Sequence, residues 1–475
     1  MVRKISALWL LFLVTPFLLY SSELGPPPKP LVLRGVTVID ATGAPPMPEM
    51  TVIILGNRIS TIGKSSTVSL PQDAQVVEAE GKFLIPGLWD MHVHLFNHVT
   101  LSEPGEMYFP LLIANGVTSV RDMWTRLDDF PDVQEWRKQF AQGRPIPRIA
   151  AVGTMIDGAV PIWPEADTVA NSEEARQTVN NLKKNGIDFV KVYWNLSREE
   201  YFAIAAESKK QNIPFGGHVP FAVSAVEASD SGQSSIEHLT EIFISCSAKE
   251  EELRKVDPKD WGLKHEKEIL DTYDAAKCQQ LFSHFVKNQT WQVPTLDFYQ
   301  KLVLDEQQLL KDPRLKYIPS STREDWESFI DLMKKRTPEQ IDFGRAQWRA
   351  YLKLVGAMHQ AGVKFMAGTD MGISLSYIYP GFSLHDELAL LVEAGFTPME
   401  ALQAATRSPA EFLNRSDSIG TIEKGKIADL ILLDGNPLED IHNTQRIAAV
   451  VLDGNLLNRE SLDKMLAEEQ TTWGK

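Results

Sequence analysis

The sequence predicts an α/β fold in which a (β/α)8 barrel of the TIM type forms the body of the protein. Eight β-rich runs in the middle of the chain are each followed by a helical pattern, and such alternation implies a parallel sheet that can close into a barrel. Further β-rich runs without helices lie on both sides of this region. The 475 residues, 43% hydrophobic and 23% charged, suit a globular protein of this size and exclude a disordered or polytopic membrane chain. An open doubly wound sheet is the alternative.

The charge and cysteine content of the chain argue against a nucleic-acid-binding protein, a disulfide scaffold and a Cys-rich zinc module. The chain has 48 Lys and Arg against 63 Asp and Glu, a net charge of −15. An acidic surface repels phosphate backbones, so we expect no nucleic-acid partner. The two cysteines, Cys246 and Cys278, cannot form a disulfide framework or a Cys-rich zinc module, and the sequence leaves open whether they pair. Any metal must therefore be held by His, Asp or Glu.

Residues 1–22 predict a signal peptide or an N-terminal anchor. Arg3 and Lys4 precede an apolar run from Ile5 to Tyr20, which matches the basic and hydrophobic regions of an export signal. A Pro-rich linker follows over residues 23–30. We expect an exported protein, periplasmic or secreted, that contacts the membrane only if this segment stays uncleaved.

Residues 31–82 and 420–460 predict one composite β domain. Gly56-Asn57 separates two β-rich runs in the first block, which is a two-residue hairpin signal. Neither block alone has enough strands for an independent core. We therefore predict that the two chain ends pair into a small β-sandwich beside the barrel.

Residues 83–419 predict the barrel. Ser197, Thr397 and Ser408 each precede a Glu by three residues and predict capped helix starts. A region rich in Lys, Glu and Asp, between residues 245 and 357, predicts solvated helices beside the mouth. The strand candidates are Phe83–His94, Val117–Asp122, Arg148–Gly153, Phe189–Tyr193, Phe215–His218, Ser235–His238, Trp291–Leu296 and Lys364–Asp370.

Histidines and one aspartate stand at the ends of these strand candidates. His92 and His94 are two residues apart, so both side chains point the same way from a strand. His218, His238 and Asp370 end later candidates. Active sites of such barrels lie at the carboxyl ends of the strands. Four imidazoles and a carboxylate meeting there predict a metal site.

Lys191 lies within the apolar candidate Phe189–Tyr193. A buried ammonium group is costly and lowers its own pKa, so it needs a reason. One reading is a side chain that reaches the rim. Beside the predicted metal site we favour a functional reading, in which the neutral amine takes up CO2 and the resulting carbamate bridges two metals.

Four further residues are candidates for substrate contacts. Tyr193 and Arg121 lie near strand ends, His98 follows the first strand closely, and His385 follows the eighth. Each has a plain structural alternative, such as a surface loop for His98 or a helix entry for His385.

The order of these motifs resembles the amidohydrolase superfamily and is most similar to its imidazolonepropionase-like branch, which includes metal-dependent Xaa-Pro and Xaa-Arg/Lys dipeptidases. The resemblance extends from about residue 31 to residue 457. Imidazolonepropionase itself has a single-metal site without the lysine, so Lys191 argues against that activity. The motifs are Pro86-Gly-Leu-Trp-Asp-Met-His92-Val-His94, Gly116-Val-Thr-Ser-Val-Arg-Asp122, Phe189-Val-Lys191-Val-Tyr193, Ile236-Glu-His238, Ala367-Gly-Thr-Asp370 and Gly425-Lys-Ile-Ala-Asp-Leu-Ile-Leu-Leu-Asp434.

The resemblance implies two divalent metal ions, with Zn²⁺ as the default, and a CO2-derived carbamate on Lys191 that bridges them with a hydroxide. It also implies that Asp370 is catalytic, taking the proton of the attacking hydroxide and passing it to the leaving nitrogen. The implied ligands are His92, His94 and Asp370 for a buried metal, His218 and His238 for an exposed one, and Lys191 for both.

These observations predict a binuclear hydrolase that cleaves the C–N bond of a small substrate, such as a dipeptide or an N-acyl amino acid. The same chemistry would serve an ester, a lactone or a phosphotriester, which is the second hypothesis. A non-catalytic scaffold protein is the third, but it predicts missing ligands, and all six are present. The sequence leaves the substrate, the metal and a homo-oligomeric state open.

Overall fold

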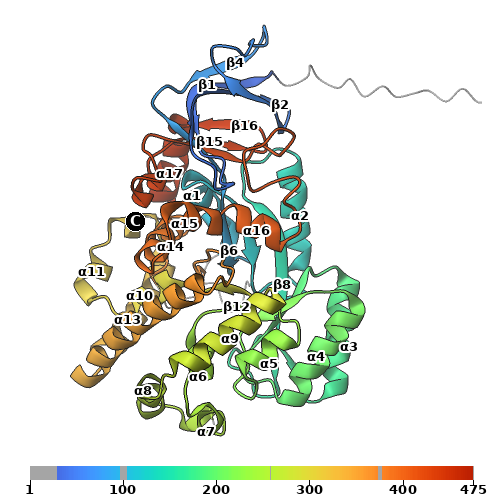
Figure 1. Ribbon diagram of the computed structural model, residues 1–475, viewed down its shortest axis with the longest axis vertical. Helices are drawn as coiled ribbons and strands as arrows, with labels where there is room; N and C mark the ends of the chain where they lie inside the picture. Colours follow the sequence, from blue (N-terminus) through green and yellow to red (C-terminus); the bar gives the residue numbers. More distant parts are fainter. Residues whose placement is uncertain (1–28, 97–103, 257, 373–376, 474–475) are drawn as a thin grey trace, which may run out of the picture.

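A computed structural model of the protein describes residues 29–96, 104–256, 258–372 and 377–473. Figure 1 shows a β domain at the top, and below it a strand barrel surrounded by helices. The predicted signal segment and His98 lie outside the described residues, so the structure does not bear on them.

The β domain is one eight-stranded sheet drawn from both ends of the chain. Its order is β16-β15-β14-β5-β1-β2-β3, with β4 paired to β1. Antiparallel pairing of β14 with β5 joins the two ends, and Gly56-Asn57 forms the predicted turn between β2 and β3. The strands are β1 (Leu31–Val38), β2 (Met47–Leu55), β3 (Arg58–Lys64), β4 (Gln75–Glu78), β5 (Phe83–Pro86), β14 (Leu430–Leu433), β15 (Ile447–Leu452) and β16 (Asn455–Asn458).

The barrel contains seven parallel strands in the order β13-β12-β11-β10-β8-β7-β6, which confirms the predicted α/β barrel. A short extra strand, β9 (Asp167–Val169), pairs with β8. The barrel strands are β6 (Leu88–Val93), β7 (Val117–Asp122), β8 (Arg148–Gly158), β10 (Phe189–Val192), β11 (Phe215–Gly217), β12 (Ser235–Glu237) and β13 (Trp291–Val293).

The eighth candidate, Lys364–Asp370, closes the barrel without forming a regular strand. Isolated parallel bridges join this part of the chain to β13 and to β6, and the Asp370 N–H donates to the His92 carbonyl at 2.8 Å. Asp370 has a φ of 65°, which is incompatible with extended backbone. The segment therefore bends at the residue that was predicted to be a metal ligand.

The first candidate, Phe83–His94, is divided between the two domains. Its first part is β5 of the β domain and its second part is β6 of the barrel, with Gly87 between them. A Cβ atom at Gly87 would lie 2.3 Å from the Thr118 hydroxyl oxygen, so the two strands come together where only glycine fits. One apolar run thus connects the sheet to the barrel.

Helices cover the barrel between its strands. Ser197 and Thr397 form the predicted capping boxes. The predicted start at Ser408 is wrong, because Ser408 lies inside the helix, whose N-cap is Thr406, two residues earlier. The helices are α1 (Phe109–Ala114), α2 (Phe130–Ala141), α3 (Ser172–Asn185), α4 (Arg198–Gln211), α5 (Ala225–Asp230), α6 (Thr240–Ser245), α7 (Glu250–Leu253), α8 (Leu263–Asp271), α9 (Ala275–Asn288), α10 (Leu296–Lys301), α11 (Glu306–Leu310), α12 (Ser320–Lys334), α13 (Pro338–Gln360), α14 (Phe382–Glu393), α15 (Pro398–Ala404), α16 (Arg407–Phe412) and α17 (Arg459–Trp473), with 3-10 helices at Gly105–Tyr108, Pro258–Asp260, Pro313–Tyr317 and Ile441–Gln445.

The charged region between residues 245 and 357 forms helices that are not simply solvated. Helix α12 buries Trp326, Phe329 and Ile330 in an apolar cluster with Tyr377 and Tyr379. In the described part of the chain, no helix is both long and apolar enough to cross a membrane.

Cys246 and Cys278, which the sequence left open, form a disulfide. Cys246 caps the end of α6 and Cys278 lies in α9, with 32 residues of separation along the chain. A cross-link of this kind restricts the unfolded chain more than the folded one. It ties together two helices that follow β12, next to the predicted site.

We expect the double variant Cys246→Ser/Cys278→Ser to fold but to lose about 2–4 kcal/mol of unfolding free energy, because the closed loop is long. Urea unfolding of the purified protein measures this loss. Wild-type protein kept in a reducing agent is the control and should show the same midpoint as the variant. Equal midpoints for oxidised wild type and variant would contradict a stabilising disulfide.

Candidate metal centre

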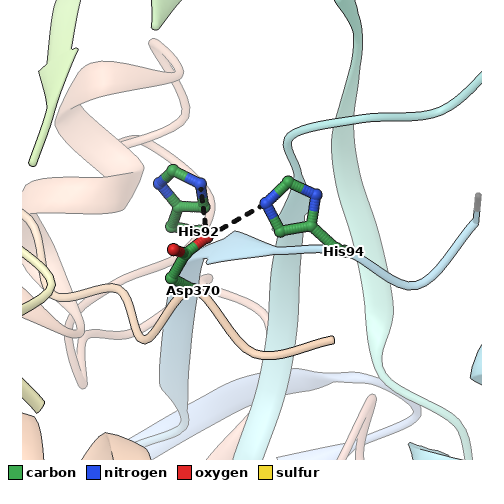
Figure 2. A group of neighbouring side chains, drawn as sticks. All are labelled: His92, His94 and Asp370. Atoms are coloured by element: carbon green, nitrogen blue, oxygen red, sulfur yellow. Dashed lines mark hydrogen bonds and ion pairs between the residues drawn. The ribbon is translucent and has the colours of Figure 1, made fainter. Parts of the chain in front are cut away.

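Three residues meet at the floor of the barrel mouth, as Figure 2 shows. His92 and His94 come from the end of β6, and Asp370 from the segment that closes the barrel. The Nε2 atoms of His92 and His94 lie 3.1 and 3.0 Å from the same Asp370 oxygen, Oδ1. All three side chains are buried. Two imidazoles and a carboxylate around one point form the start of a metal site.

Three of the four imidazoles, those of His94, His218 and His238, are kept in the form that binds metals. Burial lowers the pKa of His94 to about 3 and that of His238 to about 4, and it holds the pKa of His218 well below its usual value. Neutral imidazole is the ligand form. The buried nitrogens His94 Nδ1 and His218 Nδ1 have no hydrogen-bond partner among the described residues. Such unpaired buried nitrogens are costly unless they serve another purpose, and they fit a divalent metal ion.

The second group of predicted ligands lies beside the first. The His238 ring is 4.9 Å from the His92 ring and 4.7 Å from the His218 ring, measured between centroids. His238 Nδ1 is hydrogen-bonded to the Thr295 hydroxyl at 2.8 Å, and its Nε2 lies 4.0 Å from Asp370 Oδ2. The Thr295 contact therefore leaves Nε2 directed at the site.

Lys191 points into the same pocket and is 2% exposed. Burial lowers its pKa to about 8, although Asp370 and Glu237 act in the opposite direction. The lowered pKa increases the fraction of Lys191 that is neutral at neutral pH. The neutral amine is the form that can take up CO2. Lys191 lines the pocket together with His94, His218, His238 and Asp370, and His92 contacts Asp370 without lining the pocket itself.

Arg121 and Glu237 form a fully buried ion pair that supports His92. Arg121 Nη2 donates to Glu237 Oε1 and Oε2 at 2.8 and 3.0 Å, Nε donates to the Met91 carbonyl, and Nη1 to the Ser235 hydroxyl. Burial opposes ionisation, but Arg121 and His92 outweigh it and lower the pKa of Glu237 to about 2. His92 Nδ1 donates to Glu237 at 2.9 Å, so a neutral His92 has its lone pair on Nε2. Burial lowers the pKa of His92, but Asp370 and Glu237 outweigh it and raise that pKa.

The predicted substrate role of Arg121 is not supported, because its donors are directed to these buried partners and it does not line the pocket. The same holds for His385, whose ring nitrogens contact the Thr444 hydroxyl and the Asn115 carbonyl away from the pocket. Tyr193 does line the pocket, with its ring 4.3 Å from that of His218. The sequence analysis missed Glu237, although it directly precedes His238 in the motif.

The pocket above the floor has a volume of about 410 Å³. Its walls are mostly aromatic and aliphatic, and of these wall residues only Tyr193 was predicted from the sequence. Trp124 and Trp194 follow the ends of β7 and β10 by two residues, a signal that could have been noticed. A larger cavity of about 630 Å³, between α10 and α14, contains none of the predicted ligands. The wall residues are Trp124, Met155, Ile162, Trp163, Tyr193, Trp194, Phe298, Tyr299, Leu302, Phe329 and Leu332.

Comparisons with known proteins bear on the family and the fold of this chain. The amidohydrolase family matches residues 349–457, which include Asp370. An adenine deaminase of Paracoccus denitrificans is 34% identical over 96 residues, 20% of this chain and 16% of the deaminase. An ochratoxinase of Aspergillus niger is 37% identical over 103 residues, 21% of this chain and 20% of the ochratoxinase. The chain thus aligns with a fifth or less of the length of these two curated relatives.

Solved structures match over nearly the whole chain. A structure from Bifidobacterium longum with a provisional prolidase assignment has a TM-score of 0.67 and 24% identity, covering 94% of this chain and all of that one. A Xaa-Pro dipeptidase with methionine bound in its active site has a TM-score of 0.65 and 20% identity, covering 90% of this chain and 100% of that one. At such identities the likeness shows the fold. The resemblance to the amidohydrolase superfamily is confirmed.

We expect Arg121→Leu to weaken metal binding about 10–100-fold, because Glu237 would lose the partner that orients it toward His92. The variant should also lose about 3–5 kcal/mol of unfolding free energy, since it leaves a buried carboxylate unpaired. Metal retained after dialysis against a graded series of chelator concentrations measures the first effect.

Arg34→Leu is the matched control, because Arg34 pairs with Glu78 on the exposed surface of the β domain. It should change stability by less than about 1 kcal/mol and leave metal binding unchanged. Equal metal retention by both variants would argue against a supporting role for Arg121.

Proposed function

We propose that this protein is a metal-dependent hydrolase that cleaves the C–N bond of a small amide. The observation that carries the proposal is the convergence of six potential ligands at the mouth of one barrel, with Lys191 among them. His92, His94 and Asp370 are in contact, and His218 and His238 adjoin them. The confirmed resemblance to amidohydrolases supports this reading, since proteins of that superfamily hydrolyse such bonds.

In this proposal His92, His94 and Asp370 would hold one divalent ion, and His218 and His238 would hold a second. Lys191, once carboxylated by CO2, would supply oxygen ligands to both. Divalent ions bound there, with Zn²⁺ as the default, would lower the pKa of a water molecule and polarise the scissile carbonyl. The unpaired Nδ1 atom of His218 supports this assignment.

Asp370 serves as the proton carrier. It is the one carboxylate among the described residues that line the pocket, and it is held at the floor by its backbone bond to His92. A carboxylate placed there can accept the proton of the attacking water and deliver it to the leaving nitrogen. The aromatic side chains that line the pocket with Asp370 would limit the access of bulk water and so the loss of this proton to solvent.

The similar structures suggest the form of the substrate. One of them is a Xaa-Pro dipeptidase, and an ochratoxinase is among the sequence relatives. Dipeptides and N-acyl amino acids are therefore the first substrates to compare.

We further propose that the protein is exported. The basic and apolar N-terminal residues support this location. The disulfide between Cys246 and Cys278 also supports it, because structural disulfides persist in oxidising compartments.

Lys191→Ala tests the two-metal site. The wild-type protein should carry about two divalent ions per chain, and the variant should keep its fold, lose metal and lose activity by orders of magnitude, because the bridge has gone. Elemental analysis and amide hydrolysis are measured on the same samples. Short carboxylic acids can occupy the vacated bridge and should partly restore the variant.

Asp370→Ala is the matched control for this rescue. It should stay inactive with the same acids, because the proton carrier itself is missing. If Lys191→Ala keeps two metals and most of its turnover, Lys191 is a rim residue and the bridging role is wrong.

Fusion of residues 1–30 to a reporter that works only outside the cytoplasm should give activity, because Arg3, Lys4 and the apolar run form an export signal. A control fusion replaces both basic residues by Glu and should lose most of this activity. A stably produced but inactive wild-type fusion would remove the proposed location.

A further inference from the structure

We propose that the substrate is an uncharged amide with an apolar group on each side of the scissile bond and no ionised carboxylate beside it. This inference rests on the proposed function and narrows it, because it disfavours free dipeptides and N-acyl amino acids. It is supported by the apolar side chains of the two pocket walls. It is also supported by the lack of Lys or Arg, other than Lys191, among the described residues that line the pocket.

The first wall comes from the loops that follow β7, β8 and β10. Trp124 and Trp163 have ring centroids 5.8 Å apart, and the Trp163 indole N–H donates to the Tyr193 hydroxyl at 3.0 Å. Tyr193 and Trp194 in turn contact the His218 ring, at 4.3 and 4.8 Å. Tyr193 and Trp194 also pack against each other, with ring centroids 5.4 Å apart. The four side chains therefore hold one another in place and form an aromatic surface that reaches down to the floor.

The second wall comes from the helices that follow β13. Phe298 of α10 lies 6.4 Å from the His238 ring, and Leu302, Phe329 and Leu332 complete this side of the pocket. β13 is separated from β8 by three strands in the sheet order, which places it across an eight-membered barrel from β8. The two walls thus face each other over the floor.

The pocket offers a carboxylate no cation in its walls. Lys191 is the only Lys or Arg among the described residues that line it, and the proposed carbamate would turn that side chain into an anion. Arg121 is committed to Glu237. An ionised carboxylate buried without a partner is strongly disfavoured.

The rim of the pocket is also apolar. Leu332 is 55% exposed and Ile162 44%, and both line the pocket. Val160, in the same loop as Ile162, is 79% exposed. Exposed aliphatic side chains around an aromatic pocket favour a substrate whose apolar groups extend toward the mouth.

The sharpest test compares two substrates that differ only in charge. N-Benzoyl-L-phenylalanine and N-benzoyl-L-phenylalaninamide have the same acyl group, ring and shape, but the first carries a carboxylate and the second a neutral carboxamide. Release of benzoate by the metal-loaded protein reports cleavage of the shared bond. We expect kcat/KM to be at least tenfold higher for the carboxamide. An equal or higher value for the carboxylate overturns the inference.

Leu332→Arg should reverse part of this preference. Its exposed position can accommodate a long side chain, and the new cation would face a substrate carboxylate. We expect KM for N-benzoyl-L-phenylalanine to fall several-fold, with little change for the carboxamide. Leu310→Arg is the matched control, because Leu310 is 42% exposed and does not line this pocket. If both substitutions changed KM for N-benzoyl-L-phenylalanine equally, the proposal that the walls exclude a substrate carboxylate would lose its support.

Calorimetric titration of the same two compounds separates binding from turnover. Tighter binding of the carboxamide without any benzoate release supports the charge selectivity of the pocket and counts against the proposed hydrolysis. Equal or tighter binding of the carboxylate overturns the inference, whether or not either compound is cleaved.

Discussion

The buried ion pair between Arg121 and Glu237 is the interaction on which the site depends. A carboxylate without water is stable there because Arg121 gives it two hydrogen bonds and a third comes from the Ser235 hydroxyl. Once ionised, Glu237 fixes the proton of His92 on Nδ1 and leaves Nε2 directed at Asp370. The pair has a large desolvation cost, which argues that its value lies in orienting the ligand rather than in stability.

Barrel closure and assembly of the site use the same contacts. The backbone bonds from Asp370 to His92 and from His94 to Met371, both 2.8 Å long, join the last segment of the barrel to β6. Gly372 follows with a φ of +93°, and a Cβ atom there would lie 2.0 Å from the His94 carbonyl oxygen. The ligands therefore reach their positions only when the barrel closes, and a change that loosens closure would also separate the ligands.

The sequence alone was enough to predict those site residues whose positions are determined by a local pattern. Strand periodicity places His92 and His94 together, and a strand end identifies His218. The sequence was not enough where the role of a residue depends on a contact with a residue far away along the chain. Whether Arg121 faces a substrate or a buried acid depends on Glu237, which lies 116 residues further along the chain. The walls were missed for the same reason, because Phe329 and Leu332 belong to a helix whose place over the mouth depends on tertiary packing.

The floor and the walls of the pocket come from different parts of the fold, but the chemistry of the floor depends on the walls. Strand ends supply the floor, which sets the chemistry, whereas loops and α12 supply the walls, which set the substrate. The walls exclude water, and a drier floor favours neutral Lys191 and strengthens every electrostatic interaction there. A charged substituent would bring its hydration shell into that space and weaken the same interactions. Preference for an uncharged substrate and reactivity of the floor therefore follow from one property, the dryness that the aromatic walls impose.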